Sequence, residues 1–303
     1  MVNILSKSNT ERRAIAEAFL SVSKLETIEA ILNKKVPKGD VFEMSKAAGL
    51  LAVKKTSDVI PDCHPLPVEY TKISHTVNGT QIIIHVEVAT IYKTGVEVEA
   101  MYGASVVAMT MYDMLKPIDK DITIEKIKLL EKEGGKSDFR KDTGKGLKSA
   151  VLIVSDSIYN KKKEDTGGQI ILSTLNKNNL DNTSYEIIPD NPKILTSKVK
   201  ELSSKVDLLI ISGGTGLTKT DKTPETIKSL IDVEIPGIME TARNYGQNRT
   251  PYAMFSRGFA GTIGETLVLA IPGSTNGVKE TMDALFPYVL HGFKMLKLKN
   301  NGN

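Results

Sequence analysis

The sequence lacks the features that mark an exported or membrane-bound protein. Cys63 is its only cysteine, so no disulfide can form within the chain, which fits a reducing compartment. Residues 1–13 contain no apolar signal core. No apolar run reaches the ~18 residues that a membrane-spanning helix needs. These absences predict a cytoplasmic protein with no membrane partner.

Composition indicates a globular protein of about two domains. The chain has 303 residues, of which 40% are hydrophobic and 25% are charged. The net charge is +4, and most of it comes from residues 134–148, where five basic residues face two acidic ones. An excess in one short segment gives only weak support for nucleic-acid binding, so no nucleic acid is expected as a partner.

The same segment divides the chain. It is rich in glycine and charge and nearly free of apolar residues, which is typical of a linker. The sequence therefore predicts a first domain over residues 1–137, a linker over 138–148 and a second domain over 149–303.

The first half predicts an antiparallel sheet with helices on one face, an α+β fold of the ferredoxin-like kind. Asp40 is the expected N-cap of its long helix, and Asn78-Gly79 is a strong hairpin signal. The expected helices cover residues 10–20, 25–32, 41–59 and 96–116, and the expected strands cover 68–77, 80–92 and 121–131.

The helix over residues 96–116 carries two acidic residues on one face. Glu99 and Asp113 are separated by about 21 Å at ~1.5 Å per residue. One chain cannot easily place both in a small pocket, so either two subunits build the pocket or there are two pockets. Asp113 and Lys116 are i, i+3 neighbours, which suits an acid/base pair but equally an ordinary surface ion pair.

Two other positions in the first half suit anion binding. Lys38 lies just before a helix and could serve a phosphate, although a solvated lysine is the simpler interpretation. His64 is held extended by Pro65, which suits proton transfer or anion binding, with a buried structural histidine as the alternative. Cys63 and His64 alone are too few ligands for a metal site.

After the linker, strands and helices alternate. This order predicts a doubly wound α/β fold, a three-layer sandwich around a parallel sheet. The expected strands cover residues 150–154, 185–188, 208–211 and 266–271, with helices near 168–176 and 194–203.

The stretch over residues 208–225 predicts an anion site. A buried strand is followed by a loop with Gly213, Gly214 and Gly216, and then by a helix with Thr223 as N-cap and Pro224 at its first position. The alternative is a glycine-rich turn that only closes a strand-to-helix connection. The loop is a near miss to the nucleotide P-loop, because Thr218-Lys219-Thr220 is present but the second glycine of that motif is absent.

Three aspartates follow predicted strands. Because the carboxyl ends of parallel strands meet at one crevice, Asp156, Asp190 and Asp221 are expected to converge there. Two converging carboxylates can hold Mg²⁺ with a nucleotide and steer a phosphoryl-type transfer. Any one of these aspartates taken alone could be a cap or turn residue.

Residues 1 to about 140 resemble the cyclic pyranopterin monophosphate synthase family of molybdenum cofactor biosynthesis. The matching blocks are Lys38-Gly-Asp40, Ala48-Gly49, Ile60-Pro-x-Cys-His-Pro-Leu66, Lys93-Thr-Gly-Val-Glu-Val-Glu-Ala100, Tyr112-Asp-Met-Leu-Lys116 and Gly134-Gly-Lys-Ser137. Two residues depart from the family pattern, namely Asp62 before Cys-His and Val98 between the glutamates. An acidic Asp62 would weaken triphosphate binding.

This resemblance implies a reaction and a set of site residues. The family converts (8S)-3′,8-cyclo-7,8-dihydroguanosine 5′-triphosphate to cyclic pyranopterin monophosphate and pyrophosphate, and it assembles as a hexamer with sites between subunits. Its catalytic residues correspond to Asp113 and Lys116. Its substrate-binding residues correspond to Lys38, Cys63, His64, Glu97, Val98, Glu99, Lys132 and Lys136.

Residues 148 to 298 resemble the molybdopterin adenylyltransferase and its relatives. The matching blocks are Val154-Ser-Asp156, Asp165-Thr-Gly-Gly168, Ile188-Pro-Asp190, Gly213-Gly-Thr-Gly216, Asp221-x-Thr-Pro-Glu225, Pro236-Gly237, Ser256-Arg257 and Pro272-Gly-Ser274. Fused chains of this pair are known as a bifunctional type.

The second resemblance implies adenylylation of molybdopterin with Mg-ATP. The catalytic and Mg²⁺-binding residues correspond to Asp190 and Asp221. The expected substrate-binding residues are Asp156, Gly213, Gly214, Thr215, Gly216, Glu225, Ser256, Gly273 and Ser274. Because some relatives bind pterin with little or no catalysis, the alternative is a second domain that is a non-catalytic pterin-binding or scaffolding module.

Overall fold

A computed structural model describes residues 1–135 and 143–298 of the chain. The chain divides after Asp138 into two compact units, which are described separately. Within the described residues, no helix combines the length and hydropathy needed to cross a membrane.

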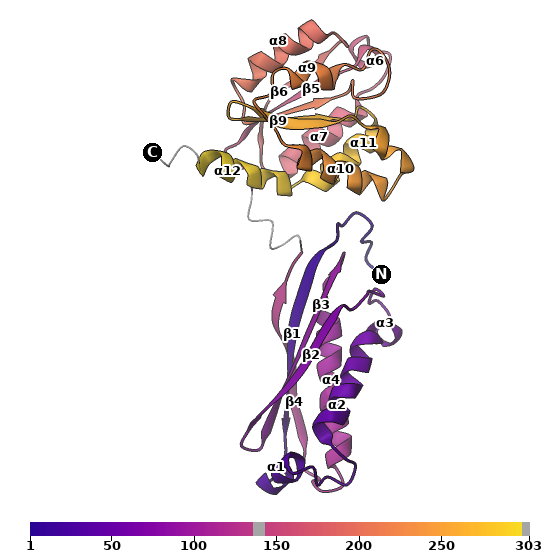
Figure 1. Ribbon diagram of the computed structural model, residues 1–303, viewed down its shortest axis with the longest axis vertical. Coiled ribbons are helices and arrows are strands. Elements are labelled where there is room, and N and C mark those ends of the chain that lie inside the picture. Colours follow the sequence, from indigo (N-terminus) through magenta and orange to yellow (C-terminus); the bar gives the residue numbers. More distant parts are fainter. Residues whose placement is uncertain (136–142, 299–303) are drawn as a thin grey trace. The chain divides into compact units, whose positions relative to one another are not determined.

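The first unit is an antiparallel sheet covered by helices. Its sheet order is β2-β3-β1-β4. Helices α2 and α4 pack against each other and against the sheet, as Figure 1 shows. The elements are β1 (Thr10–Ser21), α1 (Leu25–Leu32), α2 (Val41–Lys54), α3 (Thr56–Val59), β2 (Tyr70–Asn78), β3 (Gln81–Tyr92), α4 (Glu97–Leu115) and β4 (Thr123–Glu133).

The prediction of a helix over residues 10–20 is wrong. These residues form β1, the central strand that pairs with both β3 and β4. Alanine and glutamate favour a helix by propensity, but every second side chain of β1 is buried, which is the period of a strand. The buried set forms one face under α4: Ala14, Ala16, Ala18 and Leu20.

The other elements of the first unit agree with the pattern in the sequence. The Asp40 side chain caps α2 by accepting a hydrogen bond from the Glu43 amide at 3.2 Å. Gly79 turns the β2–β3 hairpin with a positive φ of 57°, which glycine adopts without strain. The helix expected over residues 41–59 is present as two helices, α2 and α3.

The second unit is a six-stranded sheet between two layers of helices. The sheet order is β6-β5-β7-β10-β9-β8. The first four strands are parallel, whereas β9 runs antiparallel to both of its neighbours, β10 and β8, so the sheet is mixed and not wholly parallel as expected. The strands are β5 (Lys148–Val154), β6 (Asp181–Ile188), β7 (Leu208–Ser212), β8 (Val233–Glu234), β9 (Phe259–Ile263) and β10 (Thr266–Ile271).

The helices of the second unit cover both faces of this sheet (Figure 1). Alternate residues of β7 point to opposite faces, so Leu208 and Ile210 pack in one core while Leu209 and Ile211 pack in the other. The helical elements are α6 (Asp156–Tyr159), α7 (Thr166–Lys177), α8 (Pro192–Ser203), α9 (Thr223–Lys228), α10 (Pro236–Gln247), η1 (Pro251–Phe255), α11 (Thr275–Leu285), η2 (Tyr288–His291) and α12 (Gly292–Leu298).

Two boundaries differ from the expectation. Residues 136–142, which include much of the expected linker, lie outside the described residues. Leu147 is 5% exposed and packs in the core of the second unit, so packing begins before residue 149. Helix α9 begins at Thr223, which is buried, so its expected role as N-cap is wrong; Lys222 takes the cap position without a side-chain hydrogen bond.

Candidate functional sites

Lys38, Asp113 and Lys116 form a charged cluster at the carboxyl end of α4. The Lys38 Nζ lies 2.7 Å from Asp113 Oδ2, and the Lys116 Nζ lies 2.8 Å from Asp113 Oδ1. These two lysines, Lys116 more than Lys38, lower the pKa of Asp113 to about 2. Asp113 is therefore a carboxylate at neutral pH, and it also raises the pKa of Lys116.

Helix packing explains why Lys38 reaches Asp113. Lys38 lies in the turn before α2, where Gly39 takes a positive φ of 101°. Helices α2 and α4 pack against each other, and the Lys38 Nζ also donates to the Asp113 carbonyl oxygen at 2.9 Å. The cluster thus joins two segments that are 75 residues apart.

A second, less polar cluster lies at the amino end of α4. Glu99 is 1% exposed, and its Oε1 accepts a hydrogen bond from the Cys63 thiol at 3.2 Å. Its Oε2 is buried and has no hydrogen-bond partner among the described residues. Burial raises the pKa of Glu99, and burial together with the Glu99 carboxyl raises the pKa of Cys63 to about 12. A buried polar atom without a partner is costly, so Glu99 Oε2 is a candidate contact for a ligand.

Several other residues that were expected in the first site lie close to the amino end of α4 or follow Cys63 in the chain. Glu97, in the first turn of α4, forms an ion pair with Lys132 of β4. The His64 Nε2 lies 2.9 Å from the Val2 carbonyl oxygen, and Val98 is 43% exposed. Lys136 lies outside the described residues.

A single chain therefore keeps the expected residues of the first unit in two groups. The group of Lys38, Asp113 and Lys116 is at one end of α4, and the group of Cys63 and Glu99 is at the other. Fourteen residues of helix separate Glu99 from Asp113, which is about 21 Å.

In the second unit, two of the three strand-end aspartates, Asp156 and Asp190, are in direct contact, and the charge of Asp221 acts on Asp190. The Asp156 amide donates to Asp190 Oδ2 at 3.1 Å, and the Asp190 amide donates to Asp156 Oδ1 at 3.1 Å. Strands β5, β6 and β7 are neighbours and parallel, so their carboxyl ends share one edge of the sheet. Burial, with the nearby carboxylates of Asp156 and Asp221, raises the pKa of Asp190.

Asp221 has a different environment from Asp190. Burial acts to raise the pKa of Asp221, but hydrogen bonds from Thr218 outweigh it, so the pKa is lowered. The Thr218 amide donates to Asp221 Oδ2 at 2.9 Å and the Thr218 hydroxyl donates to the same oxygen at 2.5 Å. The environment of Asp221 therefore favours its ionised form, whereas the environment of Asp190 disfavours ionisation.

The glycine loop lets backbone segments approach closely at this edge. Gly213 has a φ of 114°, and a Cβ there would run into the Val154 carbonyl. A Cβ on Gly273 would lie 3.0 Å from the Gly213 Cα, so the turn after β10 touches the turn after β7. The remaining expected loop residues, Gly214, Thr215 and Gly216, lie between this contact and Asp221.

Arg257, which lies outside the glycine loop in the chain, binds several of its oxygen atoms. Its Nε donates to the Gly216 carbonyl oxygen at 2.7 Å, its Nη2 donates to the Asp221 carbonyl oxygen at 2.5 Å, and its Nη1 pairs with Glu225. The Ser256-Arg257 motif is visible in the sequence, but only Ser256 was expected to belong to the site. A guanidinium group has a rigid fork of donors, which suits it to bridge several loop oxygens.

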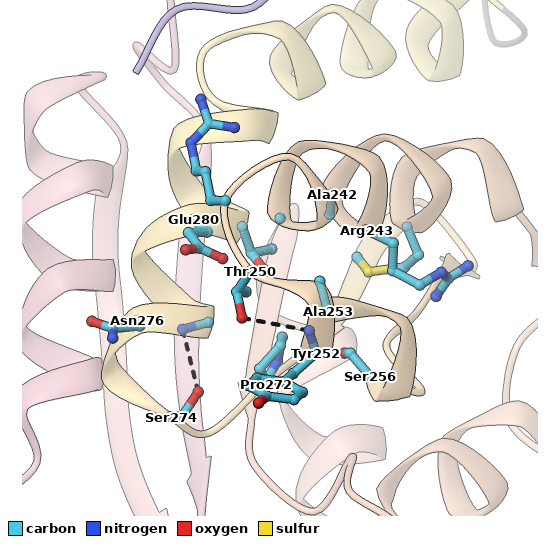
Figure 2. Close-up of a pocket in the computed structure, with 15 residues that line it drawn as sticks. Ala242, Arg243, Thr250, Tyr252, Ala253, Ser256, Pro272, Ser274, Asn276 and Glu280 are labelled. Atoms are coloured by element: carbon cyan, nitrogen blue, oxygen red, sulfur yellow. Dashed lines mark hydrogen bonds between the residues drawn. The ribbon is translucent and has the colours of Figure 1, made fainter. Parts of the chain in front are cut away.

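Ser256 and Ser274 line a separate pocket of about 420 Å³ between α10, η1 and α11 (Figure 2). The Ser274 hydroxyl caps α11 by accepting from the Gly277 amide at 3.2 Å. In Figure 2, Thr250 and Glu280 project toward the same space from different elements. The second unit therefore has a pocket between α10, η1 and α11 in addition to the glycine loop.

The chemistry of Asp190 and Asp221 can be compared with what Mg²⁺ prefers. No group of three or more His, Cys, Asp and Glu side chains suited to a metal ion is found in the parts of the chain that the structure describes. Mg²⁺ commonly takes only one or two carboxylates and completes its shell with phosphate oxygens and water. The pair Asp190 and Asp221 fits that chemistry, because a cation would relieve the crowding of carboxylates around Asp190.

Comparison with known proteins defines the class of each unit. Residues 1–135 match the MoaC family, and residues 150–291 match the family described as "Probable molybdopterin binding domain". A cyclic pyranopterin monophosphate synthase from Listeria monocytogenes is 48% identical over 138 residues, which cover 45% of this chain and 86% of that protein.

Two relatives match both units together. A molybdenum cofactor biosynthesis bifunctional protein from Chlorobaculum tepidum is 36% identical over 298 residues, covering 98% of this chain and 94% of that protein. One from Synechococcus elongatus is 32% identical over 316 residues, covering 100% of this chain and 99% of that protein. The chain belongs to the family of bifunctional molybdenum cofactor biosynthesis proteins.

Proposed function

We propose that this chain catalyses two separate reactions of molybdenum cofactor biosynthesis, one in each unit. The first unit converts (8S)-3′,8-cyclo-7,8-dihydroguanosine 5′-triphosphate to cyclic pyranopterin monophosphate and pyrophosphate. The second unit adenylylates molybdopterin with Mg-ATP. The observation that carries the first assignment is the network in which Lys38 and Lys116 hold opposite oxygens of Asp113.

In the first unit, each part of the candidate site suits one demand of the reaction. Lys38, Lys116 and His64 supply positive or proton-donating groups for a triphosphate. The pair of Asp113 and Lys116 would move protons during ring rearrangement and closure of the cyclic phosphate. With both lysines bound to it, Asp113 is a weak base, so it would accept a proton only when substrate phosphates draw the lysine charges away. The buried Glu99 carboxyl suits the polar edge of the guanine-derived ring, because its Oε2 needs a partner.

The separation along α4 supports a site that is shared by two copies of the chain. The proposed acid/base pair of Asp113 and Lys116 lies at the carboxyl end of α4, whereas the buried contact of Glu99 lies at the amino end. In a symmetric oligomer, the carboxyl end of α4 in one copy can meet the amino end of α4 in another. We therefore include a homo-oligomer, a hexamer as in the resembled family, in the proposal.

Asp113→Asn tests the first assignment. Removing the acceptor charge is expected to reduce pyranopterin formation at least 100-fold, in the range of general acid–base contributions. Asp58→Asn is the matched control, because Asp58 also pairs with a lysine three residues away, at 2.9 Å on the surface of α3. Wild-type turnover by Asp113→Asn would overturn the assignment.

In the second unit, the reaction is a nucleotidyl transfer. An oxygen of the molybdopterin phosphate attacks the α-phosphorus of ATP, and the bond to the β-phosphate oxygen breaks so that pyrophosphate leaves. Asp190 and Asp221 would hold Mg²⁺, which neutralises phosphate charge when bound. The backbone amides of Gly214 and Thr215 would orient the phosphates, since the Gly213 amide already donates to the Ile271 carbonyl oxygen. Asp156 fixes Asp190 through their paired hydrogen bonds.

Asp190→Ala and Asp221→Ala test the second assignment in the full chain. Each is expected to abolish AMP transfer to molybdopterin while pyranopterin formation continues. Asp181→Ala is the control, since Asp181 is an exposed carboxylate at the other end of β6. Unchanged transfer rates in both variants would refute the assignment. A wild-type chain that binds molybdopterin without transferring AMP would support a pterin-binding or scaffolding module instead.

A further inference from the structure

We propose that a basic cavity beside the glycine loop holds the β- and γ-phosphates of the nucleotide and then the released pyrophosphate, with Lys219 and Lys222 as its phosphate contacts. This inference rests on the proposed adenylyl transfer at the same edge of the sheet. Neither lysine was assigned a role by the motifs of the second unit.

The structure contains a cavity that is lined in part by Asp221. Its volume is about 420 Å³, and it is lined by the loop between β7 and α9 together with Arg257. Lys219 and Lys222 flank Asp221 in the chain and line the cavity with it. A triphosphate bound at the aspartates therefore has room to extend its outer phosphates toward the two ammonium groups.

The charges of the cavity favour an anion. Glu225 is paired with Arg257, and Asp221 accepts two hydrogen bonds from Thr218. Among the described residues, no carboxylate lies within ion-pair distance of Lys219 or Lys222, although the charge of Lys222 helps to lower the pKa of Glu225. Three basic residues and two acidic ones line the cavity, so its lining keeps a surplus of positive charge. Ammonium groups in such a lining suit the phosphate oxygens of a polyphosphate.

The loop that carries the lysines is held in place before any ligand arrives. The Thr223 amide donates to the Gly214 carbonyl at 3.1 Å, and the Arg257 amide donates to the Thr215 carbonyl at 3.1 Å. With the side-chain bonds of Arg257 to Gly216 and Asp221, both ends of the loop are fixed. Because the loop is preorganised, less free energy is lost in ordering it around a phosphate.

The position also suits the chemistry of the leaving group. When the oxygen of the pterin phosphate attacks the α-phosphorus, the bridging oxygen leaves with the β-phosphate and its electron pair. Pyrophosphate therefore gains negative charge during the step. Lys219 and Lys222 would stabilise that charge where it develops, and they would hold pyrophosphate until it is released.

The test compares the full-length wild type with Lys219→Ala/Lys222→Ala. We measure the KM for ATP, the KM for molybdopterin and the inhibition constant of pyrophosphate. The double variant is expected to raise the KM for ATP and the pyrophosphate inhibition constant about tenfold each, with an unchanged KM for molybdopterin. Lys200→Ala, which removes an exposed lysine of α8, is the matched control and should leave all three constants unchanged.

Calorimetric titration of the same proteins with pyrophosphate and Mg²⁺ separates this inference from the proposed function. If the wild type transfers no AMP, the adenylyltransferase assignment fails, whereas tighter pyrophosphate binding by the wild type than by the double variant still supports the cavity. Equal pyrophosphate binding by wild type and double variant would overturn the inference. A rise in the KM for molybdopterin alone would also overturn it, because the cavity would then hold the phosphate of the pterin.

Discussion

Mixing two inactive variants of the first unit gives a sharp test of a site shared between chains. Asp113 and Glu99 lie about 21 Å apart along one rigid helix, so a small pocket that uses both must draw them from different copies. Asp113→Asn damages the charged end of α4, and Glu99→Gln damages the buried end. Each variant alone is expected to have little pyranopterin-forming activity.

The recovered activity can be worked out from the pairing. In a symmetric pair of one Asp113→Asn chain and one Glu99→Gln chain, one of the two sites carries both changes and the other carries neither. Random assembly of equal amounts makes about half of the pairs mixed, so about a quarter of the sites are intact. The assay is pyranopterin formation by the two variants produced together with different affinity tags.

A third variant supplies the control for this experiment. Lys116→Ala damages the same cluster as Asp113→Asn, since the two side chains are ion-paired within one chain. Mixing these two variants leaves every site with one damaged cluster, so no activity should return. If Asp113→Asn and Glu99→Gln together show no more activity than the two alone, the site is not shared and the reasoning is refuted.

Three further predictions concern stability and reactivity. Lys116 and Lys38 lower the pKa of Asp113 from 3.8 to about 2. Their contribution to the stability of the folded protein is therefore complete above pH 4 and is lost as the pH falls toward 2. The difference in Tm between wild type and Asp113→Asn should shrink over that interval. Ala16→Leu puts a larger side chain under α4 and should lower the unfolding free energy of the first unit by about 1–3 kcal/mol in chemical denaturation, and an unchanged value would contradict the packing. With a pKa of about 12, the Cys63 thiol should react slowly with iodoacetamide at pH 7.5, and Glu99→Gln should speed the reaction, as mass spectrometry can follow on the single cysteine.

The sequence predicts the elements well where period and turn chemistry agree. Asn78-Gly79 sets the hairpin, and Asp40 caps its helix as expected. The pattern failed at β1, because the alanine-rich stretch over residues 10–21 has high helix propensity, and only its pairing with two strands imposes the extended form. Strands β8 and β9 were missed for a related reason, since they are short and become strands through pairing, β9 with β10 and β8 with β9.

In the candidate sites, too, some contacts follow from the sequence and others only from the folded structure. The meeting of Asp156 and Asp190 follows from the order of parallel strands, which the alternation of strands and helices reveals. The role of Arg257 could not be read in this way, because its side chain reaches loop residues that are 32 to 41 residues earlier in the chain. The surplus of positive charge around Lys219 and Lys222 also depends on which residues the folded loop brings together in the cavity.

Measuring both reactions on one preparation of each variant is the most direct test of two independent sites in one chain. Full-length Asp113→Asn is expected to lose pyranopterin formation and keep AMP transfer to molybdopterin, whereas Asp221→Ala is expected to do the reverse. Loss of both reactions in either folded variant, or of neither in both, would contradict the account.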